Sequence, residues 1–211
     1  MFRDLSGVPE LRRNGVLRSS RHRTSSGSPP RPGLTWAQAL FGKELALTTF
    51  DDGADVLHAG EGKSVSFPGT FSGNRVTFVH RRAGSAYSVV EWVAAPGAPG
   101  TPPHLHRATD EAFYVLEGTF DFRVGDRTLE APAGTFVFVP KGLEHAFWNG
   151  GTSEARLLST VSPPGFEGYF EELAEGLVAS GDDDEAARSL REELSEKYDI
   201  EVVGPPMRAA N

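Results

Sequence analysis

Histidine and carboxylate side chains gather in one stretch near the middle of this chain. His104 and His106 are separated by a single residue, and Glu111 follows shortly after them. Side chains two residues apart on an extended strand point to the same face, so both imidazoles can converge on one point. The same period places Glu111 on one face with Phe113 and Val115. A carboxylate on such an apolar inward face is costly unless it is paired or bound to a metal.

His145 is the fourth candidate donor. It follows a short run of β-branched and aromatic residues at 134–140 and a turn at 141–142. Three of the six histidines in the chain thus fall within 42 positions. The other three (His22, His58 and His80) are interpreted as unrelated surface or core residues.

This donor set favours transition metals, because imidazole with carboxylate suits them far better than Mg²⁺ or Ca²⁺, which prefer oxygen ligands throughout. We therefore expect one divalent transition metal, Fe, Mn, Ni, Co, Cu or Zn. Its predicted ligands are His104, His106, Glu111 and His145. Four protein ligands leave one or two positions open in five- or six-coordination, whereas a closed tetrahedral zinc would leave none.

Aromatic residues surround the donors in the sequence and are candidates for a substrate pocket. They are Phe113, Phe136, Phe138, Phe147 and Trp148. A strand turns only alternate residues inward, so about half of them should line a cavity, and core packing is the competing role for each. An aromatic cavity of this kind suits oxidation of an aromatic enol better than covalent hydrolysis.

Composition narrows the class of protein. With 211 residues, 38% hydrophobic content and 14 Phe, the chain can form one domain with appendages. It has no cysteine, which removes disulfides, thiolate catalysis and cysteine-bound zinc. No apolar run approaches a membrane span, and the pair Arg12-Arg13 is followed by further charge instead of an apolar export signal. We expect a cytoplasmic protein without a membrane partner.

The charge of the chain is unevenly distributed. The first 31 residues hold seven Arg against Asp4 and Glu10, a balance of +5. The net charge of −8 then leaves −13 on the other 180 residues. An acidic body does not favour nucleic acid, and a basic arm without interleaved aromatic residues is weak evidence for it.

The pattern along the chain predicts three parts. Residues 1–32 are rich in Arg, Ser, Gly and Pro and are expected to be a disordered basic arm. Residues 33–162 open with a possible short helix at 35–42 and continue as short strands. The strand-like runs are 76–79, 87–93, 119–124, 127–130 and 155–161, with a hairpin turn at Gly125-Asp126. Such runs, punctuated by Gly and Pro, predict an antiparallel barrel or sandwich.

The third part, residues 163–211, changes to helical spacing. Phe166, Phe170, Leu173 and Leu177 form one apolar stripe, and Ala186, Leu190, Leu194 and Tyr198 form a second after an acidic start at 182–185. These stripes need a surface to cover, either the barrel or a second subunit. A homodimer is the expected assembly.

The metal-ligand stretch resembles the two motifs of the cupin superfamily. The first motif matches His104, His106, Glu111 and Gly118, and the second matches Gly134, Pro140, Gly142, His145 and Asn149. The 15 residues between the motifs are the compact spacing of microbial cupins. The resemblance implies an all-β fold, a jelly-roll barrel or sandwich, here with a C-terminal pair of helices and the disordered N-terminal arm.

Residues 164–170 and 204–206 further resemble the tail of single-domain cupins labelled quercetin-dioxygenase-like. That resemblance implies a dioxygenase acting on a small enolisable aromatic substrate, which chelates the metal while Glu111 serves as base as well as ligand. Two alternatives stay open, namely a metal-dependent isomerase or decarboxylase and a non-enzymatic small-molecule-binding cupin. The expected partners are a small-molecule substrate, dioxygen in the first case, and a second copy of the chain.

Overall fold

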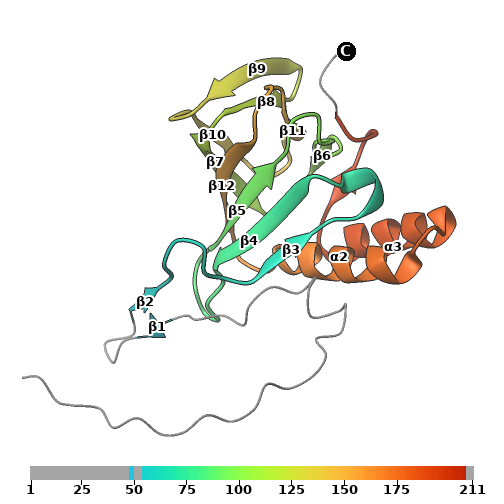
Figure 1. Cartoon of the computed structure of the whole chain (residues 1–211), viewed down its shortest axis with the longest axis horizontal. Coiled ribbons are helices and arrows are strands. Elements are labelled where there is room, and N and C mark those ends of the chain that lie inside the picture. The colour runs from blue at the N-terminus through green and yellow to red at the C-terminus, as the bar shows by residue number, and fades with distance from the viewer. Residues whose placement is uncertain (1–47, 50–53, 208–211) are drawn as a thin grey trace, which may run out of the picture. The chain divides into compact units, whose positions relative to one another are not determined.

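The computed structural model describes residues 48–49 and 54–207, which lie within one unit spanning residues 34–211 (Figure 1). The predicted arm at 1–32 and the predicted helix at 35–42 fall outside the described residues. No helix in the described ranges is both long and apolar enough to cross a bilayer.

Antiparallel strands make up most of the described chain. They are β1 (Thr48–Thr49), β2 (Asp55–Val56), β3 (Ser64–Ser66), β4 (Asn74–His80), β5 (Ser88–Ala94), β6 (His104–Leu105), β7 (Asp110–Glu117), β8 (Thr119–Val124), β9 (Arg127–Pro132), β10 (Phe136–Val139), β11 (His145–Asn149), β12 (Ala155–Ser162) and β13 (Glu201–Val202). One short 3₁₀ turn, η1 (Gly69–Phe71), and two helices, α2 (Gly168–Ser180) and α3 (Asp184–Lys197), complete the elements.

Two sheets face each other. A six-stranded sheet has the order β10-β7-β12-β5-β4-β3, and a five-stranded sheet has the order β13-β6-β11-β8-β9. A separate two-stranded pair joins β1 and β2. The predicted all-β jelly-roll sandwich with two C-terminal helices is confirmed.

Strand alternation fills the space between the sheets. On β7, Glu111, Phe113 and Val115 are each at most 4% exposed, whereas Tyr114 between them is 45% exposed. The predicted inward carboxylate is therefore real. Phe113 packs against Phe122 from the opposite sheet with ring centroids 5.3 Å apart, so aromatic side chains bridge the two layers.

The C-terminal helices pack on this sandwich. Helix α2 contacts β3 and buries Phe170, Leu173 and Leu177. Phe170 meets the ring of Trp92 on β5 at 5.5 Å between centroids. Helix α3 starts as predicted, with the Asp183 carboxylate accepting hydrogen bonds from two backbone amides of the first turn. The apolar stripe on α2 therefore covers the sandwich of its own chain, which is one of the two surfaces expected from the sequence.

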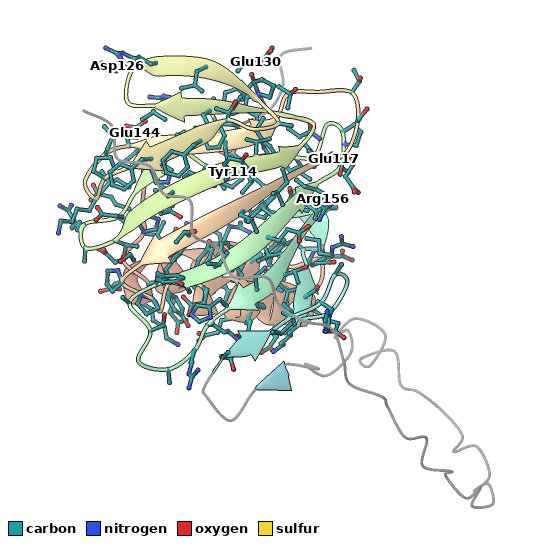
Figure 2. The ribbon with its side chains drawn as sticks, turned by 90° about the vertical axis from the view of Figure 1, so that its left-hand side faces the viewer. Tyr114, Glu117, Asp126, Glu130, Glu144 and Arg156 are labelled. Carbon is teal, nitrogen blue, oxygen red and sulfur yellow. The ribbon has the colours of Figure 1, made fainter. Side chains whose placement is uncertain are left out.

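The outer face of the six-stranded sheet carries exposed aromatic residues. Figure 2 shows this face, with Tyr114 on β7 and Arg156 on β12. Phe136 lies opposite Tyr114 on β10 and is 61% exposed, and Phe138 is 54% exposed. The homodimer stays a prediction, because nothing in the described residues shows what covers this face.

Candidate metal centre

Strand pairing brings the four predicted donors together. Glu111 lies near the start of β7, and His145 opens β11, where its register partner on β6 is His104. His106 follows β6, and its carbonyl oxygen accepts a hydrogen bond of 2.6 Å from the Gly142 amide. One possible ligand atom from each of the four donors lies within 4.8 Å of the other three, and all four residues are buried.

The tautomer of each imidazole follows from its backbone partner. Every Nδ1 lies within hydrogen-bond distance of a carbonyl oxygen, which can only accept. The pairs are His104 with Pro102 (2.7 Å), His106 with Asp199 (3.0 Å) and His145 with Leu143 (3.1 Å). Each Nδ1 therefore carries the hydrogen, and in the neutral rings each Nε2 keeps its lone pair for a metal.

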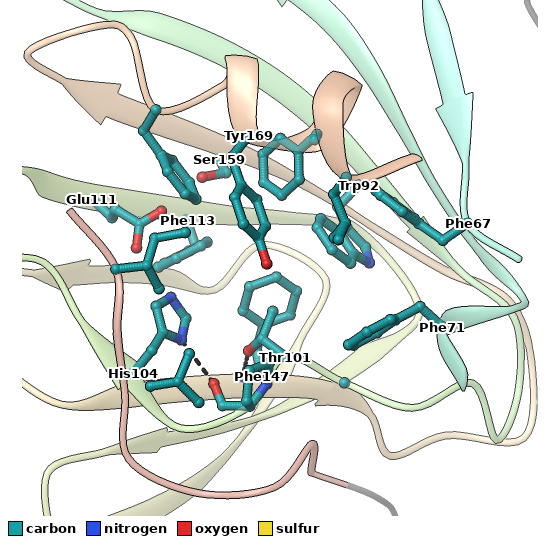
Figure 3. A pocket seen from close by; sticks show the side chains of 17 residues that line it. Phe67, Phe71, Trp92, Thr101, His104, Glu111, Phe113, Phe147, Ser159 and Tyr169 are labelled. Carbon is teal, nitrogen blue, oxygen red and sulfur yellow. Dashed lines mark hydrogen bonds between the residues drawn. The ribbon is translucent and has the colours of Figure 1, made fainter. Parts of the chain in front are cut away.

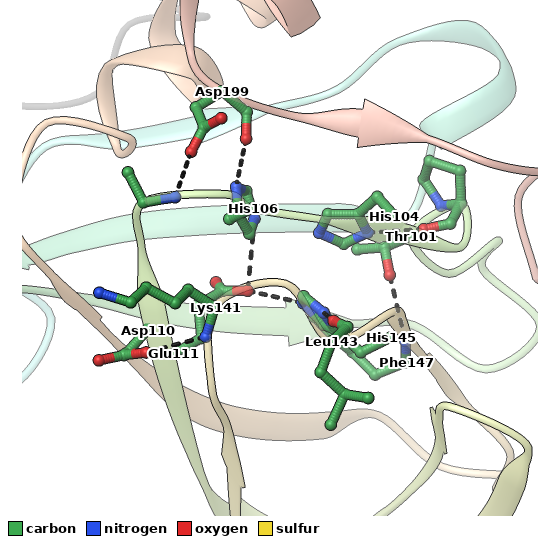
Figure 4. Close-up of polar contacts among 12 residues, drawn as sticks. Thr101, His104, His106, Asp110, Glu111, Lys141, Leu143, His145, Phe147 and Asp199 are labelled. Carbon is green, nitrogen blue, oxygen red and sulfur yellow. Dashed lines mark hydrogen bonds and ion pairs between the residues drawn. The ribbon is translucent and has the colours of Figure 1, made fainter.

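The inward-facing atoms fit a metal ion. His106 Nε2 is buried without a hydrogen-bond partner and lies 3.5 Å from Glu111 Oε2. His145 Nε2 lies 2.6 Å from the same oxygen (Figure 4). An unpartnered buried nitrogen is rare in proteins, and it is explained here if the atom is a ligand. Three imidazole nitrogens and one carboxylate oxygen could hold a transition metal ion.

The charges in the group are strongly coupled. Burial, reinforced by nearby His145, lowers the pKa of His104 to about 3, which keeps this ring neutral. Burial favours protonated Glu111, but the nearby imidazoles of His106 and His145 outweigh it and hold the pKa of Glu111 well below its usual range. Burial also disfavours charge on His145, yet its hydrogen bond to Glu111 raises the pKa of His145. Metal binding would displace the proton between these two residues.

An aromatic pocket opens beside the donors. Glu111 and His104 lie on its wall with Trp92, Phe113 and Phe147 (Figure 3). The centres of water-sized molecules can occupy about 60 Å³ of it. One buried water needs about 10–15 Å³ on a comparable scale, so the pocket admits a small, compact ligand.

Only two of the five predicted pocket residues line this cavity, Phe113 and Phe147. Phe136 and Phe138 are corrected, because they occupy the outward positions of β10 and are mostly exposed. Trp148 is buried, but it neighbours Phe147 on β11 and so occupies the opposite face of that strand. It does not line the pocket.

Several pocket residues come from elements distant in the sequence. Trp92 belongs to β5, Tyr169 to α2 and Ser159 to β12, and Ile200 precedes β13. Ser159 could have been found from the sequence, because it places a hydroxyl on the otherwise apolar inward face of β12. The residues on α2 showed only a packing stripe, which does not distinguish a core from a cavity wall.

Comparison with known proteins agrees with this geometry. Residues 90–161 match the family model described as Cupin domain. The germin-like protein subfamily T member 2 of Arabidopsis thaliana is 39% identical over 72 residues, which are 31% of this chain and 33% of that protein. The match thus spans about a third of the plant protein.

Solved structures show weaker likeness. A putative ethanolamine utilization protein Q from Salmonella typhimurium has 25% identity and a TM-score of 0.49, covering 59% of this chain and 98% of its own. The polyketide cyclase RemF from Streptomyces resistomycificus has 25% identity and a TM-score of 0.45, covering 52% and 79%. The family match makes residues 90–161 similar to a cupin domain, and the sandwich and the buried His/Glu group support the cupin superfamily.

Proposed function

We propose that the protein is a metal-dependent dioxygenase, quercetinase-like, acting on a small enolisable aromatic compound. The observation that carries this proposal is that Glu111 and His104 both lie on the wall of one aromatic pocket. A molecule in the pocket therefore reaches the donor group directly. His104, His106, Glu111 and His145 would hold the metal, which when bound supplies Lewis acidity and open coordination positions.

The pocket walls select flat, apolar molecules. Phe147 contacts Trp92 edge-on and Phe113 at a tilt, each with ring centroids 5.3 Å apart. These rings offer edges and faces to an aromatic substrate and exclude water around it. The small accessible volume favours a compact substrate over an extended one.

Two hydroxyl groups on the wall can orient such a substrate. The Tyr169 hydroxyl points into the pocket (Figure 3), and no hydrogen bond to it is found within the described part of the chain. Burial raises the pKa of Tyr169 to about 12, so it stays protonated and can donate to a substrate oxygen. Ser159, which is 5% exposed, supplies a second hydroxyl on the same wall.

Glu111 is the proposed proton acceptor. A carboxylate is a weak base compared with an alkoxide. It accepts a proton readily only from a hydroxyl that is itself acidic, and an enol or phenol next to a second oxygen meets this requirement better than an alcohol. This reasoning supports an enolisable aromatic substrate over a saturated sugar.

Oxygen uptake tests the proposal. Protein loaded separately with each of the six candidate metals is incubated with a flavonol and with smaller enolisable aromatics, while dioxygen is recorded. We expect one dioxygen consumed per substrate, with both oxygen atoms in the products. Glu111→Gln should keep part of the metal, because the amide oxygen is a weaker ligand of similar shape, and should lose most turnover.

Glu117→Gln on the exposed end of β7 is the matched control and should behave as the parent. If turnover were equally fast without oxygen, the dioxygenase proposal would be wrong, and an isomerase or decarboxylase would take its place. Binding of the aromatics without any turnover would instead indicate a non-enzymatic binding module. The expected cytoplasmic location and homodimer remain part of this proposal, and light scattering in solution would test the second.

A further inference from the structure

The C-terminal segment 199–207 runs beside the segment 100–108, which carries His104 and His106. Strand β13 pairs with β6, placing Val202 opposite His104. Further backbone bonds extend this contact along the chain. They join Val203 N to the Pro103 carbonyl (2.8 Å), Gly100 N to the Met207 carbonyl (2.8 Å) and Met207 N to the Thr101 carbonyl (3.2 Å).

Asp199, at the start of this segment, makes two hydrogen bonds to the segment that carries His106. Its carbonyl oxygen accepts from His106 Nδ1 at 3.0 Å, and its carboxylate accepts from the Ala108 amide at 2.8 Å (Figure 4). Asp199 has a φ of +56°, and it is the one non-glycine residue in the described ranges with positive φ. Asp and Asn tolerate this left-handed conformation better than most side chains.

The other two imidazoles have local partners. The Nδ1 atoms of His104 and His145 each bond a carbonyl two residues earlier in the chain. His106 instead depends on a residue 93 positions away. Among the described residues, its Nε2 is also the one buried side-chain nitrogen or oxygen that lacks a hydrogen-bond partner. The orientation of this one donor is therefore set by the C-terminal segment.

We propose that Asp199 is a positioning residue of the metal centre, which couples docking of the C-terminal segment to metal affinity through His106. The inference rests on the metal site of the proposed function but not on its reaction. The carbonyl fixes the tautomer and direction of the ring, and the carboxylate fixes the carbonyl by anchoring Asp199 to Ala108. Because such coupling is reciprocal, a bound metal must also tighten the C-terminal segment.

Co²⁺ titration of the full-length protein tests the coupling, with visible absorption reporting the geometry around the ion. Asp199→Ala removes the carboxylate anchor and disfavours the positive φ, so the carbonyl should shift away from His106. Co²⁺ should then bind about 10-fold more weakly, at the low end of what is typical when an outer partner of a ligand is disturbed. Its absorption bands should also shift. Asp199→Asn should restore most of the affinity, because Asn adopts positive φ and keeps a side-chain oxygen for the Ala108 amide.

Asp199→Gly separates the two contributions, since it permits the backbone conformation but removes the carboxylate, and it should give an intermediate affinity. Asp182→Ala, in the exposed turn between α2 and α3, is the control and should bind as the parent. Hydrogen exchange of the parent gives an independent measurement. Co²⁺ should slow exchange at the amides of Val203 and Met207.

Unchanged Co²⁺ affinity and spectrum in Asp199→Ala, even with a lower melting temperature, would show a merely structural role and overturn the inference while the metal site stands. If Asp199→Ala does not fold, equal affinity of the Gly variant and the parent would overturn it. The inference would also be overturned if Co²⁺ did not slow hydrogen exchange at the amides of Val203 and Met207. A parent that binds none of the six candidate metals would overturn the proposed metal site and this inference together.

Discussion

The strand region and the C-terminal region contribute differently to the same site. Strands and loops between residues 64 and 162 carry all four candidate donors. Residues 163–207 add none to that group, yet they provide pocket residues such as Phe166, Tyr169 and Phe170, and the carbonyl that holds His106. The chemistry of a site can thus lie in one part of a chain while its shape depends on another.

The largest expected effect comes from removing the C-terminal region. Truncation after Ser162 deletes seven buried apolar side chains, and four of them (Phe166, Phe170, Leu173 and Leu177) form the predicted stripe. At about 1.5–3 kcal/mol each, these four alone account for a loss of about 6–12 kcal/mol, comparable to the whole stability of a domain. The truncated protein should aggregate in size-exclusion chromatography. A soluble product with a cooperative thermal transition would show that the strand region is independent after all.

Removing one donor tests the strand region by itself. His145→Ala should lower metal affinity by about 3 kcal/mol, or roughly 100-fold, because one of four ligands is lost from a site worth about 10–16 kcal/mol. Elemental analysis after dialysis should find far less than one equivalent. His58→Ala changes an exposed histidine outside the group and should keep full occupancy. Equal occupancy in both variants would remove His145 from the ligand set.

A smaller effect is expected from the pocket wall on α2. Tyr169→Phe removes a hydroxyl worth about 1 kcal/mol to a bound substrate oxygen, so KM should rise about fivefold with unchanged metal content. Tyr198→Phe is the comparison, because that hydroxyl donates to Glu172 at 2.6 Å and Tyr198 is not among the pocket residues. It should leave KM unaltered. An unchanged KM in Tyr169→Phe would show that the Tyr169 hydroxyl does not bind the substrate and that the residue only lines the pocket.

The smallest effect should follow deletion of residues 1–31. The composition of this stretch predicts little apolar burial, so the free energy of unfolding should change by less than about 0.5 kcal/mol. Metal content should stay the same. A melting temperature several degrees lower, measured against the full chain, would contradict the sequence-based prediction.

The donors were predictable because their signals are local. The alternate histidines at 104 and 106, and the two-residue period of Glu111 and Phe113, require nothing beyond strand geometry. The pocket was less predictable. The run at 136–139 is apolar on both faces, so its alternation could not tell which side was inward, and Phe136 and Phe138 proved to lie outside.

Contacts between distant residues were beyond the reach of the sequence pattern. Trp92 and Tyr169 meet at the pocket only because α2 packs across β3 and β5. Likewise, nothing in the sequence pattern distinguishes Asp199 from other residues that follow a helix. Its role depends on β13 pairing with β6, which two short strands could not reveal by propensity.

The long separation between His106 and Asp199 also sets an order of events during synthesis. Translation proceeds at about 5–20 residues per second, so Asp199 is synthesised roughly 5–20 s after His106, which lies 93 positions earlier. Until then the strands can pair, but the ring of His106 is free to turn. Stable metal binding is therefore expected only near the end of synthesis, after residue 199 has been made and has docked.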